Sequence, residues 1–124
     1  MSVADLNLVV LYVDNAQVSS AFYQALLEQP VSQSSPKFVV LPLGKGTMLG
    51  LWQRDNVAPP VAAEAGGSEI ALTVANVDAV RDTYEAWKAR EVRIAQPPTA
   101  MAFGHTFVAL DPDGHRLRVF APAG

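Results

Sequence analysis

The two halves of the chain repeat one pattern of predicted secondary structure: a strand, a helix and three further strands. Residues 7–13 form an apolar run typical of a buried strand, and Asn15 after it is a suitable helix N-cap. Residues 69–74 and Asn76 repeat that strand and cap in the second half. One such module has too few elements to bury a core alone. The sequence therefore predicts an α+β fold in which two tandem βαβββ modules form a curved half-barrel cup, with the helices outside.

Apolar residues at helical spacing follow each cap. In the first helix Val18, Phe22 and Leu26 are predicted to form one face, and Pro30 ends the helix because the residue before a proline avoids helical geometry. The second helix is predicted to have a matching apolar face. Its members are Val77, Val80, Tyr84 and Trp87.

Prolines interrupt the second half after its helix. We expect a short strand at residues 92–95, because Pro97 and Pro98 cannot donate backbone hydrogen bonds to a sheet. Residues 99–104 then form a loop or a flexible flap before the closing hairpin.

The closing hairpin carries two arginines on one face of a strand. The Asp-Pro-Asp-Gly turn precedes an alternating strand, so Arg116 and Arg118 share one face while Leu117 and Val119 share the other. Burying two positive charges costs free energy unless an anionic group pairs with them. We therefore expect this face to meet an acidic group of the protein or of a ligand.

Composition narrows the classes of function. The net charge of −3, without a run of basic residues, argues against nucleic acid as a partner, and the absence of cysteine excludes disulfides and thiol chemistry. No apolar run is long enough to span a membrane and no export signal begins the chain. We predict a cytoplasmic protein that forms one domain, residues 1–124, with module one at 5–56 and module two at 68–122.

Several stretches resemble one known superfamily. The paired modules, the sequence VDNAQVSSAFY after the first strand and the closing DPDGHRLRVF resemble the glyoxalase/bleomycin-resistance/extradiol-dioxygenase superfamily, also called vicinal oxygen chelate. Within it, SEIALTV, LGLW and FGHTFVALDPDGHRLRV are similar to phenazine-antibiotic resistance proteins. The resemblance implies binding of a planar tricyclic drug without known chemistry on it.

The resemblance also locates the metal positions of metal-dependent relatives. Those relatives have His, Glu or Gln at strand positions that correspond here to Leu8, Gly50, Glu69 and Arg118. Only Glu69 offers a ligand atom, and an arginine occupies the next corner. We therefore expect no metal, no other cofactor and no catalytic residue.

Two pairs of residues define the expected ligand site. Trp52 shares a strand face with Gly50, which leaves room for a flat molecule to stack, although Trp52 as a core residue is the alternative. Glu69 and Arg118 are expected to form a bidentate pair, which either is structural or leaves Arg118 to hold a ligand carboxylate. Together, the predicted ligand-binding residues are Trp52, Arg118, Glu69, Tyr12, Phe103, Phe107 and Gly50.

The sequence leaves the orientation of two aromatic residues open. Phe103 belongs either to a flap over the cup or to a plain loop, and Phe107 faces either the cup or the helix layer. The predicted function is metal-free sequestration of a planar aromatic small molecule such as a phenazine- or bleomycin-type antibiotic. The alternative is a lyase, isomerase or dioxygenase of the same superfamily. We predict a homodimer, with ligand sites shared between subunits as one arrangement.

Overall fold

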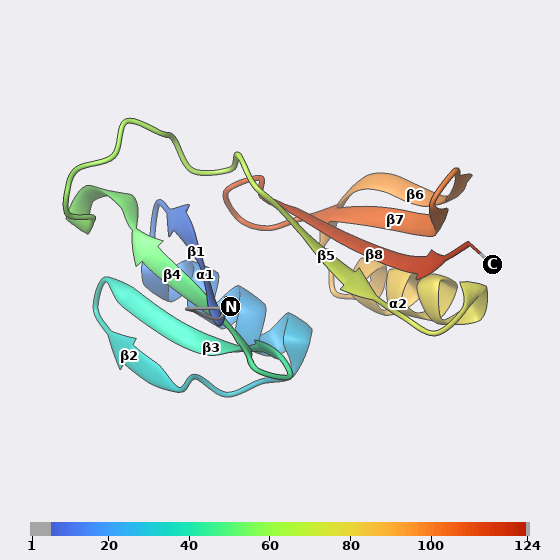
Figure 1. Ribbon diagram of the computed structural model, residues 1–124, viewed down its shortest axis with the longest axis horizontal. Coiled ribbons are helices and arrows are strands. Elements are labelled where there is room, and N and C mark those ends of the chain that lie inside the picture. Colours follow the sequence, from blue (N-terminus) through green and yellow to red (C-terminus); the bar gives the residue numbers. More distant parts are fainter. Residues whose placement is uncertain (1–5, 124) are drawn as a thin grey trace, which may run out of the picture. The chain divides into compact units, whose positions relative to one another are not determined.

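The computed structural model describes residues 6–123 (Figure 1). The chain divides into two compact units, and the break lies between Ala65 and Gly66. Each unit contains one βαβββ module, so the predicted α+β fold with two tandem modules is confirmed. The first unit comprises β1 (Leu8–Val13), α1 (Ala16–Leu27), β2 (Gln33–Ser35), β3 (Phe38–Gly44), β4 (Thr47–Gln53) and a short 3₁₀ helix, η1 (Arg54–Asn56). The second comprises β5 (Glu69–Thr73), α2 (Val77–Ala89), β6 (Arg93–Met101), β7 (Gly104–Leu110) and β8 (Arg116–Pro122).

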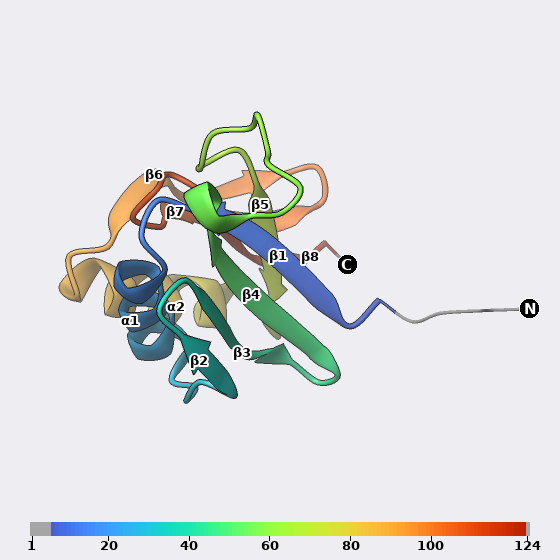
Figure 2. The same cartoon turned by 90° about the vertical axis from the view of Figure 1, so that its left-hand side faces the viewer.

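Each unit contains a mixed four-stranded sheet with one helix on one face (Figures 1 and 2). The strand orders are β1-β4-β3-β2 and β5-β8-β7-β6, with the first pair of each sheet parallel and the others antiparallel. Helix α1 packs on β3 and β4, and α2 packs on β6, β7 and β8. The fully buried strand residues facing the helices are mostly apolar and include Val13, Val39, Leu41, Leu49, Leu51, Phe107, Ala109 and Leu117.

The pairing registers of the two sheets repeat as well as their order. Val10 pairs with Gly50 between β1 and β4, and Ala71 pairs with Arg118 between β5 and β8. Gly50 and Arg118 therefore occupy equivalent positions, as the internal repeat predicts. None of the helices in the described part of the chain is long and apolar enough to cross a membrane.

Both predicted helix caps are present, but the buried face of α1 differs from the prediction. The Asn15 side chain accepts hydrogen bonds from the backbone at the start of α1, and the Asn76 side chain does so at the start of α2. Val18 is 53% exposed and cannot belong to the core. The buried residues of α1 are instead Ala16, Ser19, Ser20, Tyr23 and Leu26. The small residues on this face allow the helix to lie close to the sheet, which the apolar spacing alone did not indicate.

Strand β6 is longer than predicted. It continues through Pro97 and Pro98 and ends at Met101. Because β6 lies at the edge of its sheet, one side of its backbone needs no strand partner, and register shifts on either side of Gln96 accommodate the prolines. The predicted loop or flap is consequently part of a β-hairpin, in which Phe103 lies at the turn before β7.

The turn between β7 and β8 depends on a buried carboxylate, which leads to a stability prediction. Asp111 is fully buried, and its Oδ1 accepts hydrogen bonds from the backbone N–H groups of Asp113 at 2.8 Å and His115 at 2.9 Å. Asp111→Ala leaves both donors without this acceptor, so we expect the free energy of unfolding to fall by about 3 kcal/mol. Urea denaturation measures the change. Asp82→Ala, on the exposed side of α2, is the control, and an equal loss in both variants would contradict the role of Asp111.

Candidate functional site

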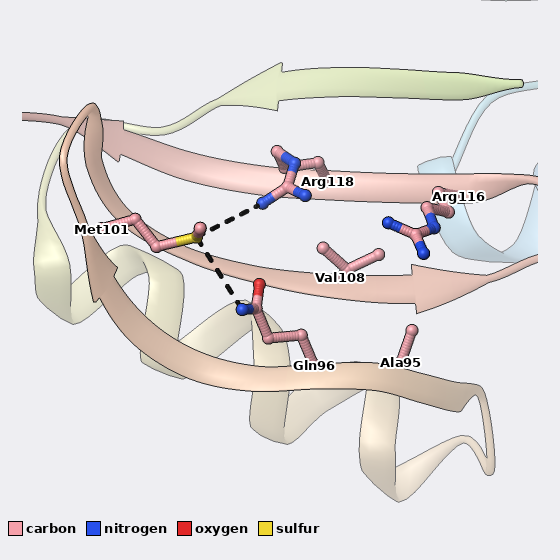
Figure 3. A pocket seen from close by; sticks show the side chains of 6 residues that line it. All are labelled: Ala95, Gln96, Met101, Val108, Arg116 and Arg118. Atoms are coloured by element: carbon pink, nitrogen blue, oxygen red, sulfur yellow. Dashed lines mark hydrogen bonds between the residues drawn. The ribbon is translucent and has the colours of Figure 1, made fainter.

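The candidate site lies on the open face of the second sheet, by which we mean the face opposite α2. In β8, Leu117 and Val119 are buried toward the helix, whereas Arg116 and Arg118 project from the open face, as predicted (Figure 3). The open face of this sheet therefore carries positive charge.

Glu69 lies between the two arginines. Its Oε2 is 3.0 Å from Nε of Arg118, and its Oε1 is 3.9 Å from Nη1 of Arg116. Glu69 pairs directly with Arg116 in the β5–β8 register, which draws the carboxylate toward both arginines. The expected bidentate Glu69–Arg118 pair is therefore corrected to one carboxylate shared by two guanidinium groups. This triad keeps one excess positive charge.

Arg118 is the more enclosed of the two arginines. Its side chain is only 16% exposed, and its Nη1 donates to Thr106 Oγ1 at 3.4 Å and contacts Met101 Sδ at 4.0 Å. Among the described residues, Nη2 of Arg118 has no hydrogen-bond acceptor. The Nη2 group of a well-positioned guanidinium thus remains available.

A pocket of about 330 Å³ opens beside the arginine pair (Figure 3). It extends across β6, β7 and β8 on the open face. Its polar lining comes from Gln96 on β6 and from Arg116 and Arg118 on β8. The lining residues are Ala95, Gln96, Met101, Val108, Arg116 and Arg118. The pocket combines cationic, amide and apolar groups, so it suits a small molecule that has both an acidic group and an apolar body.

Phe103 extends the apolar surface next to Arg118. The Arg118 guanidinium carbon lies 5.5 Å from the centre of the Phe103 ring, and Phe120 contacts that ring edge-to-face at 6.0 Å. Phe103 is 44% exposed and therefore has surface to offer a ligand. The hairpin turn at the end of β6 is what positions it.

Phe107, in contrast, is a core residue. It is fully buried and contacts Tyr84 and Trp87 of α2 edge-to-face, and the ring centres are 5.5 Å apart in each pair. Its place on the helix-facing side of β7 corrects its prediction as a ligand-binding residue. The neighbouring residues Thr106 and Val108 face the open side instead, and Val108 lines the pocket.

The open face of the first sheet is apolar where that of the second is charged. Trp52 is half-buried there, and the centre of its ring lies 5.5 Å from the centre of the Phe38 ring. Tyr12 is also half-buried and lies opposite Trp52 in the β1–β4 register. A Cβ placed on Gly50 would lie 3.3 Å from the Phe38 ring and 3.4 Å from Leu8. Leu8 and Phe38 therefore occupy much of the space that was expected beside Trp52. Phe38 was missed, although the Gly-Lys-Gly turn sets the register that pairs it with Trp52.

The positions that hold metal in metal-dependent relatives do not fit a metal ion here. Leu8 and Gly50 present no ligand atom, Arg118 is a cation, and Glu69 is engaged by both arginines. Outside these positions, side-chain ligand atoms of Asp111, Asp113 and His115 lie within 4.8 Å of one another. The Asp111 carboxylate holds the β7–β8 turn, and the ring nitrogens of His115 lie within hydrogen-bonding distance of the backbone N–H groups at positions 66 and 68.

Gln96 and Met101 were missed as site residues because β6 was predicted to end before them. Their placement on the open face follows from the continuation of β6 past the prolines, which no local pattern signals. Glu69, Arg118 and Phe103, predicted from the sequence, do lie together in the second unit.

Comparison with known proteins assigns the chain to a family. Residues 5–119 match the family model of the Glyoxalase/Bleomycin resistance protein/Dioxygenase superfamily. The chain belongs to this superfamily. The match begins before β1 and ends within β8, in agreement with the resemblance found in the sequence.

Relatives of this glyoxalase-superfamily chain include proteins from several bacteria. The phenazine antibiotic resistance protein EhpR of Enterobacter agglomerans is 28% identical over 116 residues, covering 91% of this chain and 88% of EhpR. Protein ATC0852 of Agrobacterium tumefaciens, whose solution structure is known, is 44% identical with a TM-score of 0.84, covering 98% of this chain and 99% of that protein. A glyoxalase/bleomycin resistance protein/dioxygenase from Nocardioides shares the fold, with a TM-score of 0.83 at 22% identity, covering 98% of this chain and 85% of that protein.

Proposed function

We propose that this protein binds a planar aromatic acid without transforming it, and so sequesters a small molecule such as an antibiotic of the phenazine type. The similarity to EhpR, which extends over most of the chain, supports a resistance-type function. The specific ligand and the metal-free mode of binding are our own proposal. It concerns the pocket on the open face of the second sheet.

The arginine pair that shares Glu69 is the observation that carries the proposal. Two guanidinium groups that pair with one carboxylate leave a single positive charge beside a pocket that has apolar walls. A monovalent anion would complete the charge balance, and a carboxylate accepts strong, charge-assisted hydrogen bonds from a guanidinium N–H such as the unoccupied Nη2 group of Arg118. In this proposal Arg118 holds the acid group, and Arg116 contributes charge from its more exposed position.

Apolar side chains of the same unit would contact the ring system. Met101, Val108 and the exposed ring of Phe103 lie beside Arg118 or line the pocket. An aromatic body of modest size therefore matches these walls better than a flexible polar one. Phe107 is not included, because it is buried under α2.

A comparison of two ligands tests the role of charge. Phenazine-1-carboxylate is expected to bind saturably, and its neutral carboxamide to bind about tenfold more weakly, because only the acid neutralises the excess charge. Isothermal titration calorimetry at fixed ionic strength measures both affinities. Equal affinities, or no binding of either compound by folded protein, would contradict the proposal.

We also propose that Trp52 and Tyr12 contact a ligand on the open face of the first sheet. Trp87 is buried against Phe107, whereas Trp52 has part of its ring exposed, so quenching by a stacked ligand would come from Trp52. Fluorescence titration of Trp52→Phe decides between stacking there and a purely structural role. Assembly into a homodimer is likewise a prediction, which sedimentation would test.

A further inference from the structure

The pocket contains one buried polar atom that has no partner. Gln96 lies on β6, and its side-chain carbonyl oxygen, Oε1, is buried without a hydrogen-bond donor among the described residues. A buried acceptor that makes no hydrogen bond has lost its water without compensation, which is unfavourable for the folded protein. Native structures keep such groups rarely, and a ligand that supplies the missing donor is one reason for keeping them.

The orientation of the Gln96 amide follows from its neighbour. The Nε2 group lies 3.8 Å from the Met101 sulfur, which accepts hydrogen bonds weakly and donates none. The amide nitrogen therefore belongs on the sulfur side, and the carbonyl oxygen points away from the sulfur. Figure 3 shows the amide rising from β6 toward β8 across the pocket.

The side chains of Gln96 and Arg118 both contact the sulfur of Met101. Nη1 of Arg118 lies 4.0 Å from the Met101 sulfur, on which the Gln96 amide also donates. The pocket thus has a hydrogen-bond acceptor, Gln96 Oε1, on a residue that shares the Met101 contact with the cationic donor Arg118. A molecule that fills both must carry an acid group and, near it, an N–H or O–H group.

We propose that Gln96 makes the pocket selective for aromatic acids that also carry an N–H or O–H donor, with Gln96 Oε1 accepting that hydrogen bond. The inference rests on the proposed function, since it refines the ligand class of the same site. A site built to hydrogen-bond a polar group discriminates strongly against an analogue that lacks it, because the site's buried atom then remains unpaired.

Two isosteric probes separate the donor from the rest of the ligand. Carbazole-2-carboxylate has a ring N–H, and the corresponding dibenzofuran carboxylate has a ring oxygen at that place, while shape and charge are matched. We expect the wild-type protein to bind the carbazole acid about tenfold more tightly, as measured by calorimetry.

The variant Gln96→Leu removes the acceptor and nearly preserves side-chain size. It is expected to bind both acids with the same affinity and to unfold at the same temperature as the wild type or higher, because the unpaired oxygen is gone. A lower unfolding temperature with selectivity retained would overturn the inference. So would a wild-type protein that binds both acids equally.

These outcomes separate the inference from the proposed function. Equal binding of the two acids, each lost in Arg118→Met, would leave the proposed function in place and remove the role of Gln96. No saturable binding of either acid by folded wild-type protein would overturn the proposed function together with the inference.

Discussion

Replacing Phe107 by alanine is expected to lower the free energy of unfolding by about 4 kcal/mol. The ring is fully buried between β7 and α2 and contacts both Tyr84 and Trp87. Its removal would leave a large cavity and would separate the helix from its main aromatic contact on the sheet. Chemical denaturation followed by circular dichroism measures the loss.

Phe103→Ala is the matched control for that experiment. Phe103 belongs to the same hairpin but is 44% exposed at its turn, so its removal is expected to cost about 1 kcal/mol or less. If the two variants lost similar stability, the assignment of Phe107 to the core and Phe103 to the surface would be wrong.

Replacing Arg118 by methionine is expected to weaken the binding of phenazine-1-carboxylate roughly a hundredfold. The substitution keeps an apolar stem but removes the guanidinium group that we propose as the partner of the ligand carboxylate. The side chain is largely enclosed, so solvent screens this interaction less than one on the surface. Calorimetric titration measures the change.

Glu69→Gln extends the same experiment in the opposite direction. Because Glu69 competes with the ligand for the arginines, its neutralisation is expected to tighten binding of the acid about fivefold. Glu85→Gln, on the exposed side of α2, changes the net charge by the same amount and controls for a general effect of charge. Weaker binding in Glu69→Gln would mean that Glu69 positions Arg118 for the ligand rather than competing with it.

The elements that could be predicted from the sequence depend on residues that are close along the chain. Asn15 and Asn76 cap the helices through donors two or three residues away, and the alternation from Arg116 to Val119 assigns those side chains to two faces. The repeat of the βαβββ order is likewise visible as spacing. Such signals need no knowledge of what packs on what.

The part of the candidate site that the sequence missed depends on contacts between distant segments. Whether Phe107 or its neighbours face the open side is decided by α2 packing on the sheet. Gln96 joins the site because β6 pairs with β7 beyond the prolines, and an edge strand tolerates prolines that an interior strand does not. Two arginines come to share Glu69 because the β5–β8 register places all three together.

The sequence by itself therefore determined the α+β repeat, the helix caps, the turn before β8 and the presence of an arginine pair on one strand face. Only the tertiary structure decided which sheet face α2 covers, which aromatic residues remain exposed and which polar atom in the pocket lacks a partner. The physical reason is that periodicity and capping are local, whereas burial and ion pairing depend on which distant strands and helices meet.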